Sequence, residues 1–515
     1  MRAALVLVAV ATALASALGT PTPLDDYVYH DDGAFAYTYA GDEHTVGGNG
    51  WAAYMYNVTS QRWFDASFSS KPVWTHQMAI IIPHDVNTTL DSAFLYITGQ
   101  GTPRPNHYPH ADDEGLAIAA AIAKNAKSPG AVMWQVPDEC IVFSHDPFGP
   151  DHYRTEDAAI AFTWWAYSHP EKLGKSVADP RWVLELPMTK AGVKAIDVIQ
   201  QVVPRHTGGV AINGVYVAGA SKRGWTTWLV GAVENGPKGK GRVRGIMPIV
   251  LDALNVVAFA HRQWTYYGAW TFALSDYYKM NFTQDIDEPY TKSLMQLVDP
   301  YYYMSRLTMP KLALNAVGDE FQMPDDQRHW AHLMPGEMHL LMVKNAEHSM
   351  ATGVFEILQS AGAMIQACQQ NVPRPVYTWS IDNATGAITV VTDTKPTVVT
   401  VTWADSPQGV SAGRRDFRWA AINASFCVVK VFGACVRPVI WETTSSEYIT
   451  QPQPNTYVAQ MPLPPAGVWR GFILELQWEN TGGPDDFYFT SPTSVIPNTA
   501  PFPDCHGRQC RGTLC

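Results

Sequence analysis

The sequence lacks several features that would point to other classes of protein. It contains no internal repeats and no long low-complexity tract. Basic residues are fewer than acidic ones, 36 against 47, and the net charge of -11 argues against nucleic acid or an anionic membrane surface as the main partner. Beyond the N-terminal residues, no stretch is long and uncharged enough to cross a membrane.

Apolar and aromatic residues are abundant instead. Hydrophobic residues make up 46% of the 515, and the chain contains 18 Trp, 23 Tyr and 19 Phe. Such a chain can bury large cores, which excludes global disorder. Its length predicts two or three domains rather than one.

The N-terminus, residues 1–19, has the pattern of a secretory signal peptide. Arg2 gives a basic start, Ala3 to Leu14 form an apolar run, and Ala15-Ser16-Ala17 supplies a small-x-small cleavage pattern. A membrane anchor is the alternative, but the run is shorter than the roughly 20 apolar residues that a spanning helix needs. We therefore expect a secreted, extracellular protein without an integral membrane span.

Two further features fit an oxidising, extracellular compartment. Sequons for N-glycosylation occur at Asn57, Asn87, Asn281, Asn383 and Asn423. There are seven cysteines, of which Cys427 and Cys435 are spaced to close a hairpin, whereas Cys505, Cys510 and Cys515 form a small terminal knot. Because seven is odd, at least one thiol is free or bridges to another chain. Zinc binding by the terminal CHGRQCRGTLC is the alternative there.

Alternating strand-like and helix-like segments predict an α/β fold with a mostly parallel sheet covered on both faces. The helix that ends near residue 203 is expected to begin at the capping residue Thr189. Strands are expected at 74–82, 92–98, 130–136, 213–219, 243–251, 311–317 and near 340, and the other helices at 115–125, 156–168, 222–233 and 350–368.

Three segments depart from this alternation. Residues 252–305 are dense in aromatics and are interpreted as a lid or cap insertion, or as a helical subdomain with its own core. Residues 374–500 carry short strand-like runs between turn signals, which predicts a small all-β, sandwich-like domain. Residues 501–515 form a Cys-rich tail, which leaves 20–373 as the α/β domain.

The segment GVYVAGASKRGW carries the candidate nucleophile, Ser221. A β-branched strand runs into Gly219-Ala220-Ser221 and a helix follows at once, as at the nucleophile elbow of an α/β hydrolase. The N–H groups at the start of that helix would face the negative charge that develops in the reaction. The usual G-x-S-x-G pattern is broken, because Arg223 occupies the second glycine position. An ordinary serine in a strand–helix turn is the alternative.

Two further segments supply the rest of a serine triad, in the order Ser, Asp, His that this fold uses. The strand in KLALNAVGDEF ends at Asp319, the candidate acid, and the loop in MHLLMVKNAEHSM carries His348, the candidate base. His348 would take the proton from Ser221, and Asp319 would orient the imidazole. Asp252, which closes the strand after the Ser221 helix, is the rival acid.

An oxyanion hole needs two backbone donors. One is expected from the N–H of Lys222, directly after the nucleophile, and the other from Gly99, Gln100 or Gly101 in the loop TGQGTPRP. A plain glycine turn is the alternative for that loop. The proposed chemistry needs no cofactor and no metal. A loop cluster that could hold a metal lacks a helix or strand to fix its spacing; it comprises His107, His110, Asp112 and Asp113.

The motif GASKRGWTTW at 219–228 resembles the PhoPQ-activated pathogenicity-related protein family, which includes the autocrine proliferation repressor of social amoebae. Other matching segments extend over nearly the whole mature chain and include RTEDAAIAFTWW, NAVGDEFQMPDD, NAEHSM and RRDFRW. The family has arginine at position 223, which accounts for the broken elbow pattern. The resemblance implies an α/β-hydrolase fold with a C-terminal β domain, but no firm reaction.

The resemblance also suggests a substrate. The amoebal member has been likened to dipeptidyl peptidases, although this chain lacks their N-terminal propeller. Cleavage of dipeptides would require acidic anchors for a free amine, and Glu156 with Asp157, or Asp138 with Glu139, are the candidates. The alternative for the first pair is structural, because acids are favoured at the start of a helix.

Competing functions follow from these features. The first is a secreted serine hydrolase that cleaves an ester or peptide bond in a small-molecule or peptide substrate. The second is an extracellular signal, proliferation-repressing or chemorepellent, that acts through a cell-surface receptor, with the triad secondary. The third is a carbohydrate esterase whose β domain binds glycans through Trp379, Trp403 and Trp419, which are otherwise expected in the sandwich core.

Overall fold

The computed structural model describes residues 19–101, 107–149, 151–407, 413–422, 429–431, 434–437 and 439–515. The chain divides into two compact units. The first comprises the described parts of Met1–Pro248, Ser293–Lys311 and Leu333–Glu337, and the second those of Ile249–Lys292, Leu312–His332 and Met338–Cys515. The predicted insertion at 252–305 is therefore divided between the units, and all but the last residue of the predicted signal peptide lies outside the described residues.

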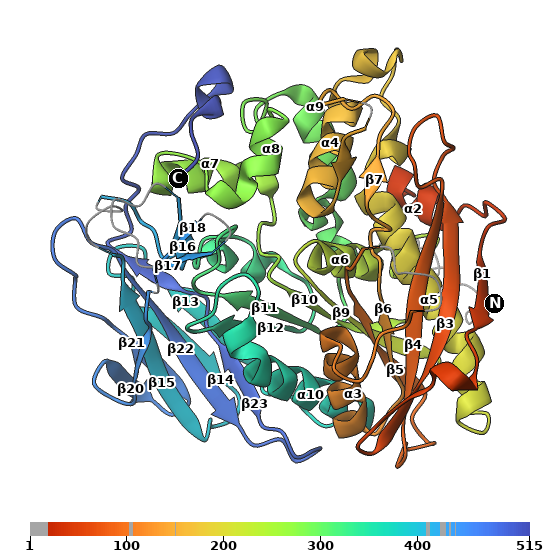
Figure 1. The fold of residues 1–515 in the computed structure, drawn as a ribbon. Coiled ribbons are helices and arrows are strands. Elements are labelled where there is room, and N and C mark those ends of the chain that lie inside the picture. Colours follow the sequence, from red (N-terminus) through yellow and green to blue (C-terminus); the bar gives the residue numbers. More distant parts are fainter. Residues whose placement is uncertain are drawn as a thin grey trace, which may run out of the picture. The chain divides into compact units, whose positions relative to one another are not determined.

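A mixed sheet forms the centre of the first unit (Figure 1). Its strands occur in the order β1-β3-β4-β6-β5-β9-β10, and β2 pairs with β3. β5 runs parallel to β6 and β9, whereas β4 is antiparallel to β3 and β6. The bounds are β1 (Ala36–Tyr39), β2 (Val46–Gly48), β3 (Trp51–Arg62), β4 (Val73–Pro83), β5 (Ser92–Ile97), β6 (Gly130–Met133), β9 (Gly214–Ala220) and β10 (Val243–Ile249). The central strands β5 and β6 are buried along their whole length, as their continuous apolar sequences predict.

Helices cover both faces of this sheet. A Cβ at Gly192 of α5 would lie 3.0 Å from Ile97, and one at Gly115 of α3 would lie 3.4 Å from Thr98. Because successive residues of an extended chain point to opposite faces, α3 and α5 pack on opposite sides. The helices of the first unit are α2 (Pro23–Tyr29), α3 (Glu114–Ala126), α4 (Glu156–Ser168), α5 (Glu185–His206) and α6 (Lys222–Glu234), and a short pair β7 (Ile141–Val142) and β8 (Tyr153–Arg154) lies outside the sheet.

Helix α5 begins at Glu185, four residues before the predicted start at Thr189. Thr189 is not a cap, because its hydroxyl donates to the carbonyl of Glu185 at 2.7 Å, one turn back inside the helix. Pro187 stands in the first turn, where the missing N–H is not needed for an intrahelical bond. The sequence pattern was misleading because proline and a capping residue both fall within the first turns.

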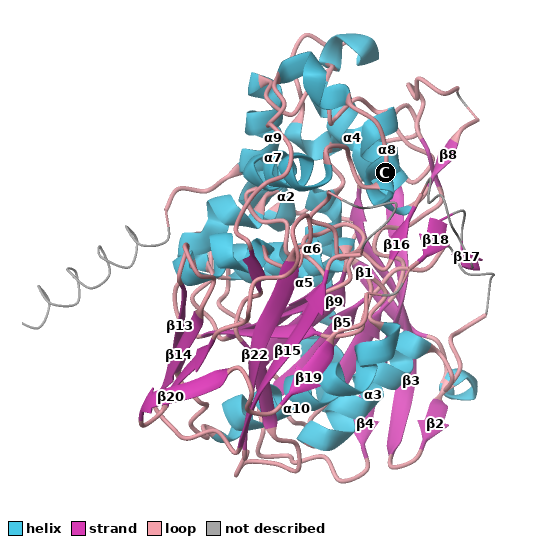
Figure 2. Ribbon diagram, turned by 90° about the vertical axis from the view of Figure 1, so that its left-hand side faces the viewer, coloured by secondary structure: helices cyan, strands magenta, loops and turns pink. Residues whose placement is uncertain are grey.

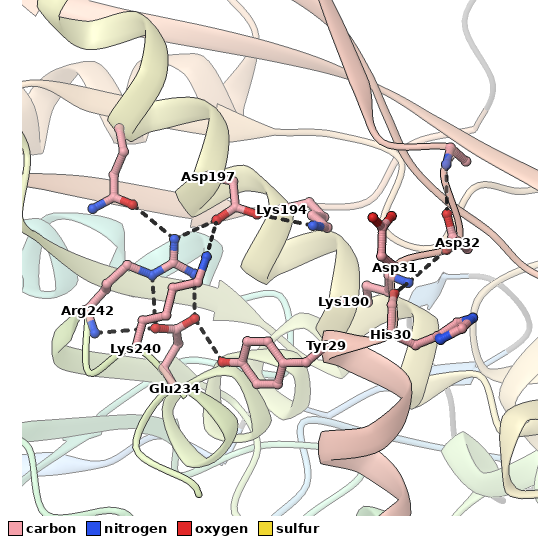
Figure 3. Close-up of polar contacts among 12 residues, drawn as sticks. Tyr29, His30, Asp31, Asp32, Lys190, Lys194, Asp197, Glu234, Lys240 and Arg242 are labelled. Carbon is pink, nitrogen blue, oxygen red and sulfur yellow. Dashed lines mark hydrogen bonds and ion pairs between the residues drawn. The ribbon is translucent and has the colours of Figure 1, made fainter. Parts of the chain in front are cut away.

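A buried ion-pair network fixes the far end of α6, the helix that begins after Ser221 (Figure 3). Arg242 binds Glu234, the last residue of α6, at 2.6 Å, and Asp197 of α5, also at 2.6 Å. The hydroxyl of Tyr29 on α2 donates to Glu234 at 3.0 Å. Two helices and the segment before β10 are thus joined to the C-terminal end of α6.

The second unit combines two strands with antiparallel sheets. β11 (Lys311–Ala316) and β12 (Met338–Val343) are neighbours, and α10 (Val354–Gln370) follows them. One antiparallel sheet has the order β13-β14-β21-β20 and another the order β19-β15-β22-β23, with β24 also paired to β22; Figure 2 shows the two groups. The bounds are β13 (Tyr377–Ile381), β14 (Ile388–Thr392), β15 (Val398–Asp405), β19 (Glu442–Thr444), β20 (Ile449–Gln453), β21 (Thr456–Ala459), β22 (Arg470–Trp478), β23 (Phe487–Thr490) and β24 (Ser494–Ile496).

The remaining elements of the second unit are a small sheet and the helices of the predicted insertion. The sheet has the order β16-β18-β17. The bounds are β16 (Ala420–Ala421), β17 (Val429–Val431), β18 (Ala434–Val436), α7 (Val256–Tyr267) and α8 (Ser275–Lys279); α9 (Pro289–Val298) begins in the second unit and ends in the first. The predicted C-terminal β domain is confirmed as a set of antiparallel sheets.

A hydrophobic core joins the β sheets to the strand ends of β11 and β12. Val317, Met342, Trp441 and Ile473 are buried in it, and Trp419 packs against it. Trp419 therefore contributes to the sandwich core, the alternative that the sequence already offered for it, and its backbone N–H donates to the carbonyl of Gly318 at 3.0 Å. This contact holds the segment that leads into Asp319.

The cysteines and sequons can be placed in part. Cys505 is disulfide-bonded to Cys510, and Cys515 is buried. Asn57, Asn87, Asn281 and Asn383 are exposed, as a glycan would require; Asn423 and Cys427 lie outside the described residues. Glycosylation and the Cys427–Cys435 bond stay predictions. Among the described helices, none is both long enough and apolar enough to span a bilayer.

Candidate active site

Ser221 lies in the turn between β9 and α6, where the sequence predicts a nucleophile. Its backbone has φ 58° and ψ -126°, a region that residues other than glycine rarely occupy. Such a conformation persists only where the surrounding structure enforces it. It is the strained strand-to-helix turn on which α/β hydrolases present their serine.

Gly219 makes this turn possible. A Cβ at this position would lie 2.7 Å from the carbonyl oxygen and 2.9 Å from the carbonyl carbon of Arg223. Backbone atoms cannot yield to such a contact as a flexible side chain can, so only glycine fits. The helix then starts at once, since the N–H of Trp225 donates to the carbonyl of Ser221 at 3.0 Å.

The predicted oxyanion loop lies beside this turn. β5 and β9 are neighbouring parallel strands, and Ile97 at the end of β5 is paired with Gly219. The loop that follows contains Gly99, which packs so closely on Arg223 that a Cβ would collide with Nη2, and Gln100, whose φ is 98°. In α/β hydrolases the oxyanion donors come from the residue after the nucleophile and from the loop after a neighbouring strand, which correspond here to the ends of β9 and β5. Donation by Lys222 and by Gly99, Gln100 or Gly101 stays a prediction.

Arg223 and Lys222 bind the acids at the start of α4. Arg223 contacts both carboxylate oxygens of Glu156, Nη2 with Oε1 at 2.6 Å and Nη1 with Oε2 at 2.7 Å. Lys222 Nζ lies 2.6 Å from Glu156 and 3.1 Å from Asp157. Burial raises the pKa of Glu156, but the charges of Arg223 and Lys222 outweigh it and hold that pKa well below its usual range.

The acids predicted as substrate anchors therefore have protein partners. A substrate ammonium at Glu156 would compete with Arg223 and Lys222, whose bonds to it are short. Asp138 is engaged as well, with Lys71 Nζ at 2.8 Å and the N–H of Thr75 at 3.0 Å. Glu156 and Asp157 thus bind the two residues that follow Ser221, and the sequence did not reveal these partners because they are distant in sequence. The role of substrate anchor stays a prediction.

Glu139 is the second acid next to Glu156. Its side chain accepts a hydrogen bond from the N–H of Glu156 at 2.7 Å. Burial and the neighbouring charge of Glu156 raise the pKa of Glu139 to about 7. The pair therefore favours the anionic form of Glu156 and the protonated form of Glu139.

A cavity of about 320 Å³ is lined by residues that surround Arg223. Gly99, Gln100 and Arg223 line it together with three acids, Asp113, Glu114 and Glu156. Asp113 caps α3 by accepting from the N–H of Leu116 at 3.0 Å, so it has a structural role there. Among the described residues, the clusters of possible metal ligands do not include the loop of His107 and His110.

Asp319 and His348 meet in the second unit. Nδ1 of His348 lies 2.8 Å from Oδ2 of Asp319, and the other oxygen of Asp319 accepts from the N–H of Phe321 at 2.7 Å. The N–H of His348 donates to Glu320 at 3.1 Å, and the ring of His348 lies 4.4 Å from that of Phe321, centroid to centroid. Asp319 is buried, so its carboxylate is preorganised to orient the imidazole.

Asp252, the rival acid, is placed differently. Its carboxylate accepts from the side-chain amide of Gln327 and from the indole N–H of Trp330, the latter at 2.9 Å. Burial, together with the nearby charge of Asp326, raises the pKa of Asp252 well above its usual value. Because Asp252 is bound by Gln327 and Trp330, these contacts give it a structural role, whereas the acid that contacts His348 is Asp319.

Comparison with known proteins fits this geometry. The profile of the PhoPQ-activated pathogenicity-related protein family matches residues 24–418. The chain belongs to this family. Autocrine proliferation repressor protein A of Dictyostelium discoideum is 33% identical over 494 residues, which cover 94% of this chain and 92% of that protein. Arg223 and its partner Glu156 both lie within the part that the family profile matches.

Solved structures that resemble this family member include hydrolases. Acetyl xylan esterase 1 from Thermoanaerobacterium sp. is 13% identical, with a TM-score of 0.42 over 69% of this chain and 98% of the esterase. An S-formylglutathione hydrolase from Agrobacterium tumefaciens is 11% identical, with a TM-score of 0.36 over 65% of this chain and 100% of that one. The strand order itself shows an α/β domain with a mixed sheet, followed by antiparallel C-terminal sheets, as predicted.

Proposed function

We propose that the chain is a secreted serine hydrolase that cleaves an ester or peptide bond through Ser221, His348 and Asp319. The observation that carries the proposal is the backbone of Ser221, held at φ 58° and ψ -126° between β9 and α6. This backbone conformation costs free energy. A nucleophile elbow retains it because the sharp turn exposes the serine hydroxyl, whereas an ordinary strand–helix turn does not require it. The bond between Asp319 and His348 supports it independently.

In the proposed reaction the imidazole of His348 removes the proton of the Ser221 hydroxyl, and the oxygen attacks the carbonyl carbon. Asp319 stabilises the resulting imidazolium. Backbone N–H groups of Lys222 and of the loop after β5 would hold the oxyanion of the tetrahedral intermediate. His348 returns the proton to the leaving group, and water then hydrolyses the acyl-enzyme by the same route in reverse.

The test is labelling of the full chain with a fluorophosphonate probe, which reacts with activated serines. The wild type should be labelled at one site, and Ser221→Ala and His348→Ala should not react. Ser380→Ala, which removes an exposed serine of β13, is the matched control and should label normally. Absence of labelling in folded wild type, or labelling that survives Ser221→Ala, would eliminate the hydrolase proposal.

A second function rests on the 33% identity to a protein named for repressing proliferation. In that case the chain acts as an extracellular signal on a cell-surface receptor. The two functions separate when Ser221→Ala is added to proliferating cells. Repression that survives the substitution assigns the signal to binding, and repression that is lost with it assigns the signal to hydrolysis.

A further inference from the structure

A cluster of imidazoles and carboxylates in the second unit lies outside the site described above. His261 is on α7, Asp287 lies just before α9, and His506 belongs to the C-terminal tail. Nε2 of His261 lies 2.9 Å from Asp287, and Nδ1 of His506 lies 3.9 Å from the other oxygen of Asp287. Asp287 follows His261 by 26 positions and His506 stands near the end of the chain, so only folding brings these three side chains together.

The ligand atoms of this cluster have the chemistry that zinc prefers. Two imidazole nitrogens and one carboxylate oxygen, with a water in the fourth position, form a common tetrahedral zinc set. Bonds of about 2.0–2.1 Å place tetrahedral ligands roughly 3.3 Å apart. The atoms of His261, Asp287 and His506 all lie within 4.8 Å of one another, so small side-chain movements would bring them to that spacing.

Asp504 contacts the second ring nitrogen of His261, and this contact also supports zinc binding by His261. Its Oδ1 lies 2.8 Å from Nδ1 of His261, on the opposite side of the ring from Asp287. A carboxylate that accepts from the second ring nitrogen fixes the tautomer and the orientation of a metal-binding histidine. Asp504 is itself held, because Oδ1 also accepts from the N–H of Cys505 at 2.8 Å.

The tail is held in place independently of any metal. The N–H of Phe502 donates to the carbonyl of Thr265 at 3.1 Å, and the N–H of Trp270 donates to the carbonyl of Thr513 at 2.9 Å. Figure 1 shows the C-terminus beside α7. The N–H of Gly507 donates to Asp287 at 2.9 Å, next to His506. His506 is therefore presented to the cluster by an ordered backbone.

We propose that His261, Asp287 and His506 bind one Zn²⁺, with Asp504 as the positioning residue of His261. Cys505 lies near His261 and Asp504, but its sulfur is bonded to Cys510 and supplies no thiolate. The metal would join α7, the segment before α9 and the tail. This proposal does not depend on the chemistry of Ser221.

Calorimetric titration of chelator-treated full-length protein with Zn²⁺, in a buffer without reductant, tests the proposal. One Zn²⁺ should bind per chain, and Mg²⁺ at the same concentration should not compete. His506→Gln and Asp287→Asn should each weaken binding by at least about tenfold, and Asp504→Asn by about 10–100-fold. Arg508→Gln, an exposed change in the same tail, is the matched control and should bind as the wild type does.

Two results would overturn the proposal. One is the absence of saturable Zn²⁺ binding by the wild type. The other is binding that His506→Gln and Asp287→Asn leave unchanged. Protection of the tail from proteolysis gives a second readout, because Zn²⁺ should slow cleavage after Arg508 or Arg511 in the wild type but not in Asp287→Asn.

Discussion

The guanidinium of Arg223 binds both carboxylate oxygens of Glu156, at 2.6 and 2.7 Å, although the two residues lie 67 positions apart in sequence. The usual elbow has a glycine where this chain has Arg223. Here the second position after the proposed nucleophile carries a cation that joins the first turn of α4 to the first turn of α6. The elbow is therefore supported by a distant segment as well as by its own turn.

Loss of this pair should destabilise the protein. Arg223→Gln leaves the carboxylate of Glu156 without its bidentate partner, and we expect a cost of about 1–3 kcal/mol in the free energy of unfolding. This free-energy cost is smaller than that expected for a fully buried ion pair, because the side chain of Glu156 is 37% exposed and solvent screens the interaction. Urea unfolding at pH 7 measures it.

Arg181→Gln is the matched control for Arg223→Gln. Arg181 also binds one carboxylate with two nitrogens, that of Asp179, but its side chain is 63% exposed. An exposed pair contributes about 0.2–1 kcal/mol. Equal losses in the two variants would show that Arg223 has no special role in stability.

The sequence predicted the α/β domain because its signals are local. The predicted helix at 156–168 agrees with α4 (Glu156–Ser168), where an acidic start and helical apolar spacing coincide. The strand β5 is apolar and bounded by turn signals, and it was also found. Strand β3 (Trp51–Arg62) was not predicted, since its residues alternate between exposed and buried less regularly than a simple period of two requires.

The parts that the sequence did not reveal depend on contacts between distant segments. The residues Ser221, Asp319 and His348 could be selected because each follows a strand, in an order that the fold fixes. The partners of Glu156 could not, because nothing near Glu156 in sequence indicates Arg223 or Lys222. The zinc ligands proposed above likewise share no local motif, and the sequence suggested zinc only within the terminal tail.

The raised pKa of Glu139 should make stability fall as the pH rises. Its pKa is about 7 in the folded protein, against about 4.3 for an unperturbed glutamate. Between these values the folded state holds a proton that the unfolded state has lost, so the free energy of unfolding decreases with pH. Glu139→Gln should remove this decrease.

Urea midpoints at about pH 5 and about pH 7.5 for both proteins test this prediction, since most of the interval in which only the folded state holds the proton lies between these two values. The wild type should lose more stability between the two pH values than Glu139→Gln does, and other titrating groups cancel in the comparison. Parallel pH dependence in the two proteins would show that Glu139 titrates normally.

Gly219→Ala should damage the elbow. Its Cβ would lie 2.7 Å from the carbonyl oxygen of Arg223, so the turn must open, at a cost of about 1–3 kcal/mol. The labelling rate of Ser221 should fall with it, since the displaced turn carries the proposed nucleophile. Gly47→Ala is the control, because a Cβ there meets no atom within 4 Å. A variant of Gly219 with normal stability and labelling would show that the turn tolerates a side chain.

Replacement of the two candidate acids distinguishes their roles. Asp319→Asn keeps the size of the side chain but presents an amide to Nδ1 of His348, which favours the wrong tautomer. We expect the second-order rate constant of fluorophosphonate labelling to fall about 10³- to 10⁴-fold. Asp252→Asn should change it far less per folded molecule, because Asp252 contacts Gln327 and Trp330. Circular dichroism of both variants supplies the folded fraction, and a larger loss of rate in Asp252→Asn would make Asp252 the catalytic acid.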